Sequence, residues 1–309
     1  MYQKHTLVIA LSLSLVFFAG CTKKGTSVPV AVEVSASKSQ TIRLPVDSVV
    51  VSGSVKSGLT DNTIYLWTIV SGPGVPVFSH HDATSTVVGN LVAGKYILLF
   101  SATNNQGSTG NDTTSIIVAE AITKTLVLQP GSSSTEANPN SYYLTGNGNG
   151  ITQISAIAWT HSGADERLRT YIKFDYGGLP SGAIITSAQL TLSSTLTPGG
   201  GNGADAQFGT QNACYVQRIA TDWNIASLNW NNQPTSTDVH AAVIPQSTSS
   251  FETDVVDVTQ MVKDMVASNN YGFAIKLQNE VIYNSRQYAS SFYADATLHP
   301  KLVITYQQP

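Results

Sequence analysis

The chain has 309 residues, of which 16 are Lys or Arg and 19 are Asp or Glu, so its formal net charge is −3. Charged residues make up 11% of the sequence, against roughly 25% in ordinary soluble domains. So mild a charge argues against a nucleic-acid-binding surface, and with two cysteines the fold must be stabilised by packed apolar cores rather than by a disulfide framework.

The amino terminus carries an apolar run, Leu7 to Gly20, behind a short basic stretch. The run is too short to span a bilayer but suits a secretory signal. It ends in Phe18-Ala19-Gly20-Cys21, which resembles the lipobox that directs diacylglycerol onto a cysteine thiol. The alternative is a cleaved signal that leaves Cys21 free. We therefore expect a signal peptide over 1–20 and a lipidated polar tether over 21–29 that holds the protein on an envelope membrane, the outer membrane being favoured and the leaflet open.

Residues 30–119 contain short β-branched runs separated by Gly, Pro, Asn and Asp at intervals of about ten residues, which predicts an immunoglobulin-like sandwich. Alternation points Trp67 inward, so we expect it in the core rather than at a ligand. The expected strands cover 30–36, 40–44, 47–54, 63–70, 84–88, 94–102 and 112–119.

A family resemblance sharpens this prediction. Four segments carry it, namely Gln40–Pro45, Tyr65–Pro73, Leu91–Tyr96 and Ala102–Gly107. Together they resemble a PKD domain spanning residues 30–119. The resemblance implies a spacer that holds the rest of the protein away from the membrane.

A second domain is expected over residues 120–309, whose length fits a jelly-roll sandwich. One helix interrupts its strands, with an apolar stripe that includes Met261 and Met265 and with Asp257 as the cap. This stripe should close one end of the sandwich. The predicted fold class is thus all-β: an immunoglobulin-like sandwich followed by a larger jelly roll with one short helix. The expected strands cover 124–129, 154–160, 167–175, 184–193, 213–219, 251–257, 271–277, 282–288 and 300–306.

The second domain also has a recognisable motif. Asp165-Glu166-Arg167-Leu168-Arg169-Thr170, followed by Leu228–Pro234, Asn270–Lys276 and Pro300–Tyr306, resembles the DNRLRE domain. Glu166 stands where the naming motif has Asn, and Thr170 where it has Glu. The resemblance implies a sandwich akin to carbohydrate-binding module family 96, some of whose relatives bind acidic polysaccharides such as alginate.

Sugar recognition needs aromatic faces for stacking and, for acidic sugars, the guanidinium fork of Arg. Period two sets Arg286 and Tyr288 on one face of their strand and Tyr283 on the other. The alternative places Tyr288 in the core, with Arg286 as a structural residue; Arg167 and Arg169 could likewise be salt-bridged, for example to Asp165 or Asp175. The candidate carbohydrate-binding residues are Arg286, Tyr288, Tyr283, Arg167, Arg169 and Trp159, with Tyr142 and Tyr143 as further exposed aromatics.

Two further features have structural alternatives. Trp223 and Trp230 could form a ligand platform, but a structural corner is the favoured interpretation. The glycine-rich loop that ends at Asp205 could supply oxygen atoms to a structural calcium ion, although it has one carboxylate only, and a flexible surface loop is the favoured interpretation.

No catalytic motif is present: the glutamates are scattered, there is no nucleophile elbow, and Cys214 lacks a motif histidine. We therefore expect a non-catalytic envelope lipoprotein that binds polysaccharide, acidic chains included, through its second domain. The alternative is a structural or adhesive protein that contacts envelope proteins or matrix.

Overall fold

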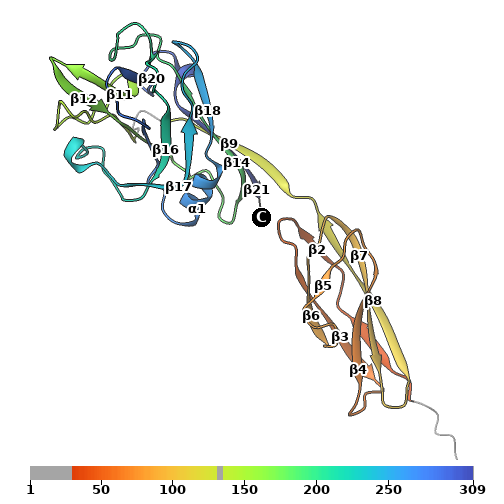
Figure 1. Ribbon diagram of the computed structural model, residues 1–309. Helices are drawn as coiled ribbons and strands as arrows, with labels where there is room; N and C mark the ends of the chain where they lie inside the picture. The colour runs from red at the N-terminus through yellow and green to blue at the C-terminus, as the bar shows by residue number, and fades with distance from the viewer. Residues whose placement is uncertain (1–29, 131–134, 309) are drawn as a thin grey trace, which may run out of the picture.

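The computed structural model describes residues 30–130 and 135–308, and Figure 1 shows two β-sandwiches that follow one another along the chain. The expected signal peptide over 1–20 and the whole expected tether over 21–29, including Cys21, lie outside the described residues. Within the described ranges, no helix is both long enough and apolar enough to cross a membrane.

The first domain consists of two four-stranded sheets, in the orders β1-β3-β6-β5 and β2-β8-β7-β4. Strand β2 runs parallel to β8, and the other pairs are antiparallel. The strands are β1 (Glu33–Ala36), β2 (Gln40–Arg43), β3 (Val49–Ser57), β4 (Ile64–Ser71), β5 (Val77–Phe78), β6 (Ser85–Gly89), β7 (Gly94–Thr103) and β8 (Thr109–Ala119).

Trp67 lies in the core of the first domain, as predicted. It is 1% exposed, and its ring centroid lies 4.9 Å from that of Phe100. Its indole N–H donates to the Ala83 carbonyl at 3.1 Å, so the polar atom of the buried ring is satisfied. Gly53 packs against the Phe100 ring, where a Cβ would come within 2.4 Å of the ring carbons.

The second domain contains three sheets, in the orders β10-β13-β19-β16-β17, β12-β11-β20-β15 and β18-β14-β21-β9. A bridge between Ser194 and Tyr288 connects the last two sheets. The strands are β9 (Ile122–Leu128), β10 (Thr135–Ala137), β11 (Gln153–His161), β12 (Ala164–Leu168), β13 (Thr170–Lys173), β14 (Ile184–Ser193), β15 (Gln207–Phe208), β16 (Cys214–Ile219), β17 (Ser236–Ile244), β18 (Thr253–Asp257), β19 (Phe273–Leu277), β20 (Asn284–Ala289) and β21 (Lys301–Gln308).

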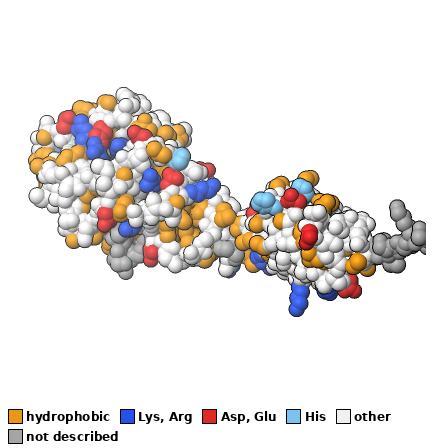
Figure 2. All heavy atoms as spheres, turned by 90° about the horizontal axis from the view of Figure 1, so that it is seen from below, with side chains coloured by type: hydrophobic (Ala, Val, Ile, Leu, Met, Phe, Trp, Pro, Cys, Tyr) orange, Lys and Arg blue, Asp and Glu red, His pale blue; other side chains and the backbone are white. Residues whose placement is uncertain are grey.

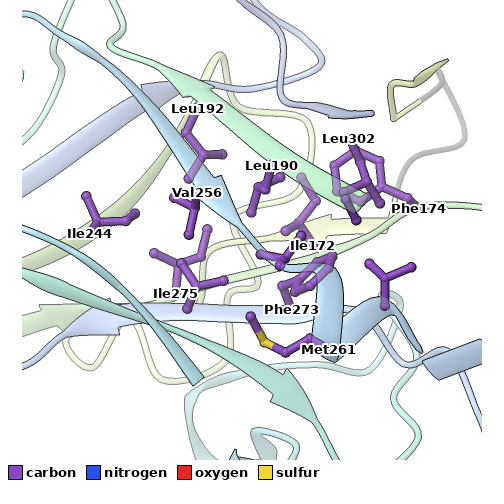
Figure 3. Packing of buried hydrophobic residues seen from close by; sticks show 14 of the residues in the cluster. Ile172, Phe174, Leu190, Leu192, Ile244, Val256, Met261, Phe273, Ile275 and Leu302 are labelled. Carbon is purple, nitrogen blue, oxygen red and sulfur yellow. The ribbon is translucent and has the colours of Figure 1, made fainter. Parts of the chain in front are cut away.

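The core of the second domain forms between its sheets. In Figure 3, Leu190, Leu192 and Val256 from β14 and β18 lie on one side, and residues of β13 and β19, such as Ile275, lie on the other. Helix α1 (Thr259–Ala267) buries Met261, Val262 and Met265 in the same cluster. The predicted apolar stripe therefore packs against the sandwich as expected.

Some elements differ from the expectation. The single strand expected over 167–175 is two strands in two sheets, because β12 pairs with β11 whereas β13 pairs with β10 and β19. Helix α1 has Val258 at its N-cap, and Asp257 accepts a hydrogen bond from the Thr259 N–H at 2.8 Å. Strand β17 was not predicted, because its sequence lacks regular alternation. Its pairing with β16 shifts register between Val216 and Arg218, and His240 has a φ of 60°.

Uncharged polar side chains and backbone cover most of the face shown in Figure 2, and charged side chains of both signs lie in small groups. This distribution reflects the 11% content of charged residues. Local groups, rather than a single charged surface, therefore determine the electrostatics of each candidate site.

Candidate functional site

The structure corrects the prediction for Arg286 and Tyr288, which are 0% and 1% exposed. The Arg286 guanidinium donates to Glu252 Oε1 at 2.6 Å and to Asp254 Oδ2 at 3.1 Å. The Tyr288 hydroxyl donates to the same Asp254 oxygen at 2.7 Å, and burial raises the pKa of Tyr288 well above its ordinary value, which keeps it a donor. These two residues form a buried network and do not reach a surface ligand.

Strand β20 pairs with β11 in the same sheet, and at the start of β20 the structure brings two predicted residues together. The Trp159 ring lies edge-to-face with Tyr283, with centroids 5.1 Å apart, and with Phe208 of β15, with centroids 5.6 Å apart. Tyr283 is 51% exposed, and Trp159 is half-buried. The two neighbouring rings hold the indole in place at the surface of the sheet.

A groove of about 390 Å³ lies beside Trp159, and we call it the Trp159 groove. Strands β11 and β12 form its floor, and the loops around Asn140 and after β14 form its walls. Its lining residues are Asn140, Tyr143, Gln153, Ile157, Trp159, Thr160, His161, Glu166, Leu168 and Gly199–Gly201.

One end of the groove carries three packed rings. The His161 imidazole lies 4.2 Å from the Tyr142 ring and 5.4 Å from the Tyr143 ring, measured between centroids. The Tyr143 hydroxyl and His161 Nε2 are 3.2 Å apart and share a hydrogen bond. Tyr142 and Tyr143 are 39% and 55% exposed, and Tyr143 lines the groove together with Trp159 and His161.

Glu166 supplies the charged group of the groove. Its Oε1 accepts a hydrogen bond from Asn140 Nδ2 at 2.7 Å and lies 3.8 Å from His161 Nδ1. Asn140 is itself fixed, because its Oδ1 accepts from the Tyr142 N–H at 2.7 Å and its backbone bridges to Leu168. The carboxylate therefore has a defined position.

The loop after β14 forms the second wall of the groove. The Gly199 N–H donates to Gln153 Oε1 at 2.9 Å, and the Gly200 N–H donates to Gln287 Oε1 at 3.0 Å. Gly201 has a φ of 60°, and a Cβ there would lie 2.9 Å from the Ser285 hydroxyl. The absence of side chains lets this loop lie close to the sheet and leaves the groove open.

Arg167 and Arg169 point away from this groove. Arg167 pairs with Asp165 at 3.1 Å, which confirms one of the expected salt bridges. Arg169 pairs with Glu280 rather than with Asp165 or Asp175, through bonds of 2.7 and 2.9 Å, and its guanidinium carbon lies 4.9 Å from the centre of the Trp230 ring. A second depression of about 400 Å³ lies here; it is lined by Arg169, Trp230 and Lys276 among others, and we call it the Lys276 depression.

Trp223 has the structural role that was favoured for it. Its indole N–H donates to the Tyr271 carbonyl at 2.8 Å, and its ring packs on a small cluster that contains Tyr171 and Leu228. This cluster covers the outer face of the sheet that contains β13, β16 and β19. The loop that carries Trp223 and Trp230 is therefore anchored by its own apolar contacts.

The Asp205 carboxylate forms hydrogen bonds within its own loop. Its Oδ2 accepts from Asn202 Nδ2 at 2.9 Å, and hydrogen bonds from Ser250 and Asn202 lower its pKa. Across the described part of the chain, no group of three or more His, Cys, Asp or Glu side chains could hold a metal ion. Calcium binding at Asp205 stays a prediction.

His161, Asn140 and Glu166 were not predicted as sugar-contact residues. A signal for His161 was available, because it lies two positions after Trp159 on the same strand and therefore shares its face. Asn140 gave no such signal, since it reaches the groove from a separate loop. Glu166 was read only as a departure from the family motif. Glu166 is the one carboxylate among the lining residues, whereas glycoside hydrolysis uses two. The groove is thus chemically equipped for binding.

Comparison with known proteins identifies both domains. Residues 145–306 match the model of carbohydrate-binding module family 96, and residues 36–118 match that of the K319L-like PKD domain. The chain is 28% identical over 117 residues to the dyslexia-associated protein KIAA0319 homolog of Mus musculus, and 29% identical to the Homo sapiens protein. These matches cover 38% of this chain and 11% of each relative, so the chain corresponds to only a small part of their length.

Solved structures give two further similarities. The PKD domain of human KIAA0319 is 18% identical, with a TM-score of 0.29, and the match covers 32% of this chain and 90% of that chain. A structure described as showing the promiscuous specificity of carbohydrate-binding modules from the β-sandwich superfamily is 11% identical, with a TM-score of 0.22; the match covers 91% of this chain and 92% of that chain.

The match to residues 145–306 takes in more than half of the 309 residues and contains the Trp159 groove, apart from Asn140 and Tyr143, as well as the Lys276 depression. It also agrees with the resemblance carried by the segment Asp165–Thr170. The chain therefore belongs to carbohydrate-binding module family 96, and its module follows a PKD domain.

Proposed function

We propose that the second domain binds polysaccharide in the Trp159 groove and that the protein acts as a non-catalytic lipoprotein of the cell envelope, with the PKD domain as a spacer. The observation that carries the site is the position of Trp159, which is held by Tyr283 and Phe208 at the edge of a groove. An indole fixed in this way can stack on a pyranose ring without losing much conformational entropy on binding.

The surroundings of Trp159 support this proposal. The groove volume of about 390 Å³ falls in the range of ligand sites in proteins. Its polar groups, among them Glu166, Thr160 and Gln153, surround the aromatic surface and can bond sugar hydroxyls. Stacking supplies affinity, and the polar groups supply orientation.

A second candidate is an acidic, alginate-like chain in the Lys276 depression. Lys276 is half-buried there, and no ion pair or hydrogen bond is recorded for its ammonium group within the described residues. The Arg169 guanidinium lies against Trp230 in the same depression. A uronic acid carboxylate could pair with Lys276 while the sugar ring contacts Trp230.

To decide between the two sites, we would compare the Trp159→Ala and Trp230→Ala variants of the full chain. Binding to alginate, pectin, β-glucan and mannan would be measured by affinity electrophoresis. Trp159→Ala should weaken binding of its glycan by roughly fivefold to a hundredfold, if a stacked sugar contributes about the 1–3 kcal/mol that a base stacked on an aromatic side chain does. Retained affinity in Trp159→Ala with a loss in Trp230→Ala would move the site to the Lys276 depression. Binding to no glycan would favour the adhesive alternative.

The envelope location is tested separately at Cys21. Metabolic labelling with a palmitate analogue should modify the wild-type protein, whereas Cys21→Ser should remain unlabelled and leave the membrane fraction. Equal labelling of both proteins would overturn the lipoprotein proposal and would not affect the glycan site.

A further inference from the structure

The charge of the Trp159 groove differs from that of the Lys276 depression. Glu166 is the single carboxylate among the residues that line the groove, and none of these residues is Lys or Arg. The depression, in contrast, is lined by Arg169 and Lys276. The two sites are therefore suited to sugars of different charge.

Glu166 is placed to act on a ligand. Its side chain is 13% exposed and is reached from the groove, and its Oε1 bonds to Asn140 at 2.7 Å. No hydrogen bond to Oε2 is recorded within the parts of the chain that the structure describes. That oxygen can accept a hydrogen bond from a ligand, and a carboxylate shielded from water exerts a stronger field than one on an open surface.

A carboxylate accepts hydrogen bonds and cannot donate them. A sugar hydroxyl supplies the donor that Glu166 requires, and a charge-assisted bond of this kind is stronger than one between neutral groups. A uronic acid instead brings a second carboxylate into the groove. Two like charges about 4–6 Å apart at a partly buried position weaken binding by roughly tenfold or more.

We propose that the Trp159 groove takes uncharged sugar residues and that Glu166 discriminates against uronic acids. This inference rests on the proposed glycan-binding function and adds the substrate class. It also separates the roles of the two sites, because an acidic chain would have to use the Lys276 depression.

The test compares each glycan with its own charged form, so that the two have the same backbone and differ only at C6, which carries a carboxylate in one and a hydroxyl or methyl ester in the other. Methyl-esterified homogalacturonan is paired with its de-esterified form, and β-glucan and mannan are paired with derivatives oxidised to the carboxylate at C6. Titrations use the full chain with Lys276→Met, which removes the cation of the second depression. All of them are run at the same pH.

The expected result is that the uncharged form binds at least about tenfold more tightly than the carboxylate form, and that Glu166→Gln reduces this preference to about threefold or less. Asp165→Asn is the matched control: Asp165 pairs with Arg167, its side chain is 66% exposed, and it does not line the groove. This variant should keep the full preference. Equal thermal midpoints of the variants show that they remain folded.

Two results would overturn the inference alone: tighter binding of the carboxylate form that is lost in Trp159→Ala, or an unchanged preference in Glu166→Gln. Binding that persists in Trp159→Ala, or no binding to any of the six polymers, would overturn the proposed groove function and the inference with it. The Trp159→Ala arm therefore distinguishes a wrong substrate class from a wrong site.

Discussion

Single residues in the interior of the second domain are constrained by charge as much as by volume. Arg286 is fully buried and bonds to Glu252 and Asp254, and its Nε donates to the Asn212 carbonyl at 3.0 Å. A buried charge is tolerated only when partners replace the water that it has lost. The network therefore depends on every member being present.

Replacing Arg286 with Met should destabilise the second domain by about 3–5 kcal/mol, because two partly buried carboxylates would lose their cation. Urea unfolding followed by tryptophan fluorescence measures the change in the free energy of unfolding. Arg167→Met is the control, since its partner Asp165 is 66% exposed at the side chain, and it should cost about 1 kcal/mol or less. Equal effects of the two variants would show that the buried network contributes no more than a surface pair.

Glu136 provides a prediction on pH dependence. It is 2% exposed, and among the described residues its Oε1 has no hydrogen-bond partner. Burial raises its pKa above the ordinary value of 4.5, against the opposing hydrogen bonds from Ser291. A raised pKa in the folded state means that this group favours folding below pH 4.5 and that the contribution is lost as pH rises through the raised value. Glu136→Gln should remove this pH-dependent part of the free energy of unfolding.

The measurement is the free energy of unfolding of wild type and Glu136→Gln between pH 4 and 8. The difference between the two should grow in favour of the variant as pH rises. A difference that stays constant over this range would contradict the assigned pKa direction. Asp165→Asn, an exposed carboxylate, serves as the control.

At the scale of elements, the loop after β14 determines whether the groove exists. Gly201 and Gly203 both have positive φ, at 60° and 73°, but a Cβ at Gly201 would lie 2.9 Å from Ser285 Oγ, whereas at Gly203 no atom lies within 4 Å. The two glycines share the backbone requirement and differ in the space around them. They are a matched pair for testing the wall of the groove.

Gly203→Ala should cost about 1 kcal/mol of stability through backbone strain and leave glycan affinity unchanged. Gly201→Ala should cost more and should also weaken glycan binding several-fold, because the loop must move away from the sheet. Thermal unfolding and titration with the bound glycan measure both effects. Equal affinity in the two variants would mean that the loop does not shape the binding site.

Strand alternation was sufficient to divide the residues of β20 between two faces. Ser285 and Gln287 share one face beside Gly201, and Arg286 and Tyr288 share the other and both bond to Asp254, as predicted. Tyr283 precedes β20 and has a φ of 70°, so its place beside Trp159 does not follow from alternation. All six residues of β20 are buried, so both faces are covered, and alternation does not say by which segments. That was decided by β18 and the segment before it, which bring Glu252 and Asp254 over Arg286.

At the scale of the whole molecule, the two domains have separate cores. The cluster around Trp67 and Phe100 and the cluster around Leu190 and Phe273 share no residue. Each sandwich thus buries its own apolar faces, which is consistent with a spacer module followed by a binding module. The sites considered for glycan binding all lie in the second module.

The sequence alone determined the all-β class, the two sandwiches, the helix stripe and the family resemblances, because these depend on local periodicity, turn residues and motifs read along the chain. Only the tertiary structure decided the site. Trp159 and Glu166 face each other in the β11–β12 pair, but Tyr283 comes from a segment far away in the sequence and Asn140 reaches Glu166 from a separate loop. Arg286 is not a surface residue, because Glu252 and Asp254 from another part of the chain pair with it in the interior. Exposure and charge pairing are set by which segments pack together, and no local pattern encodes that.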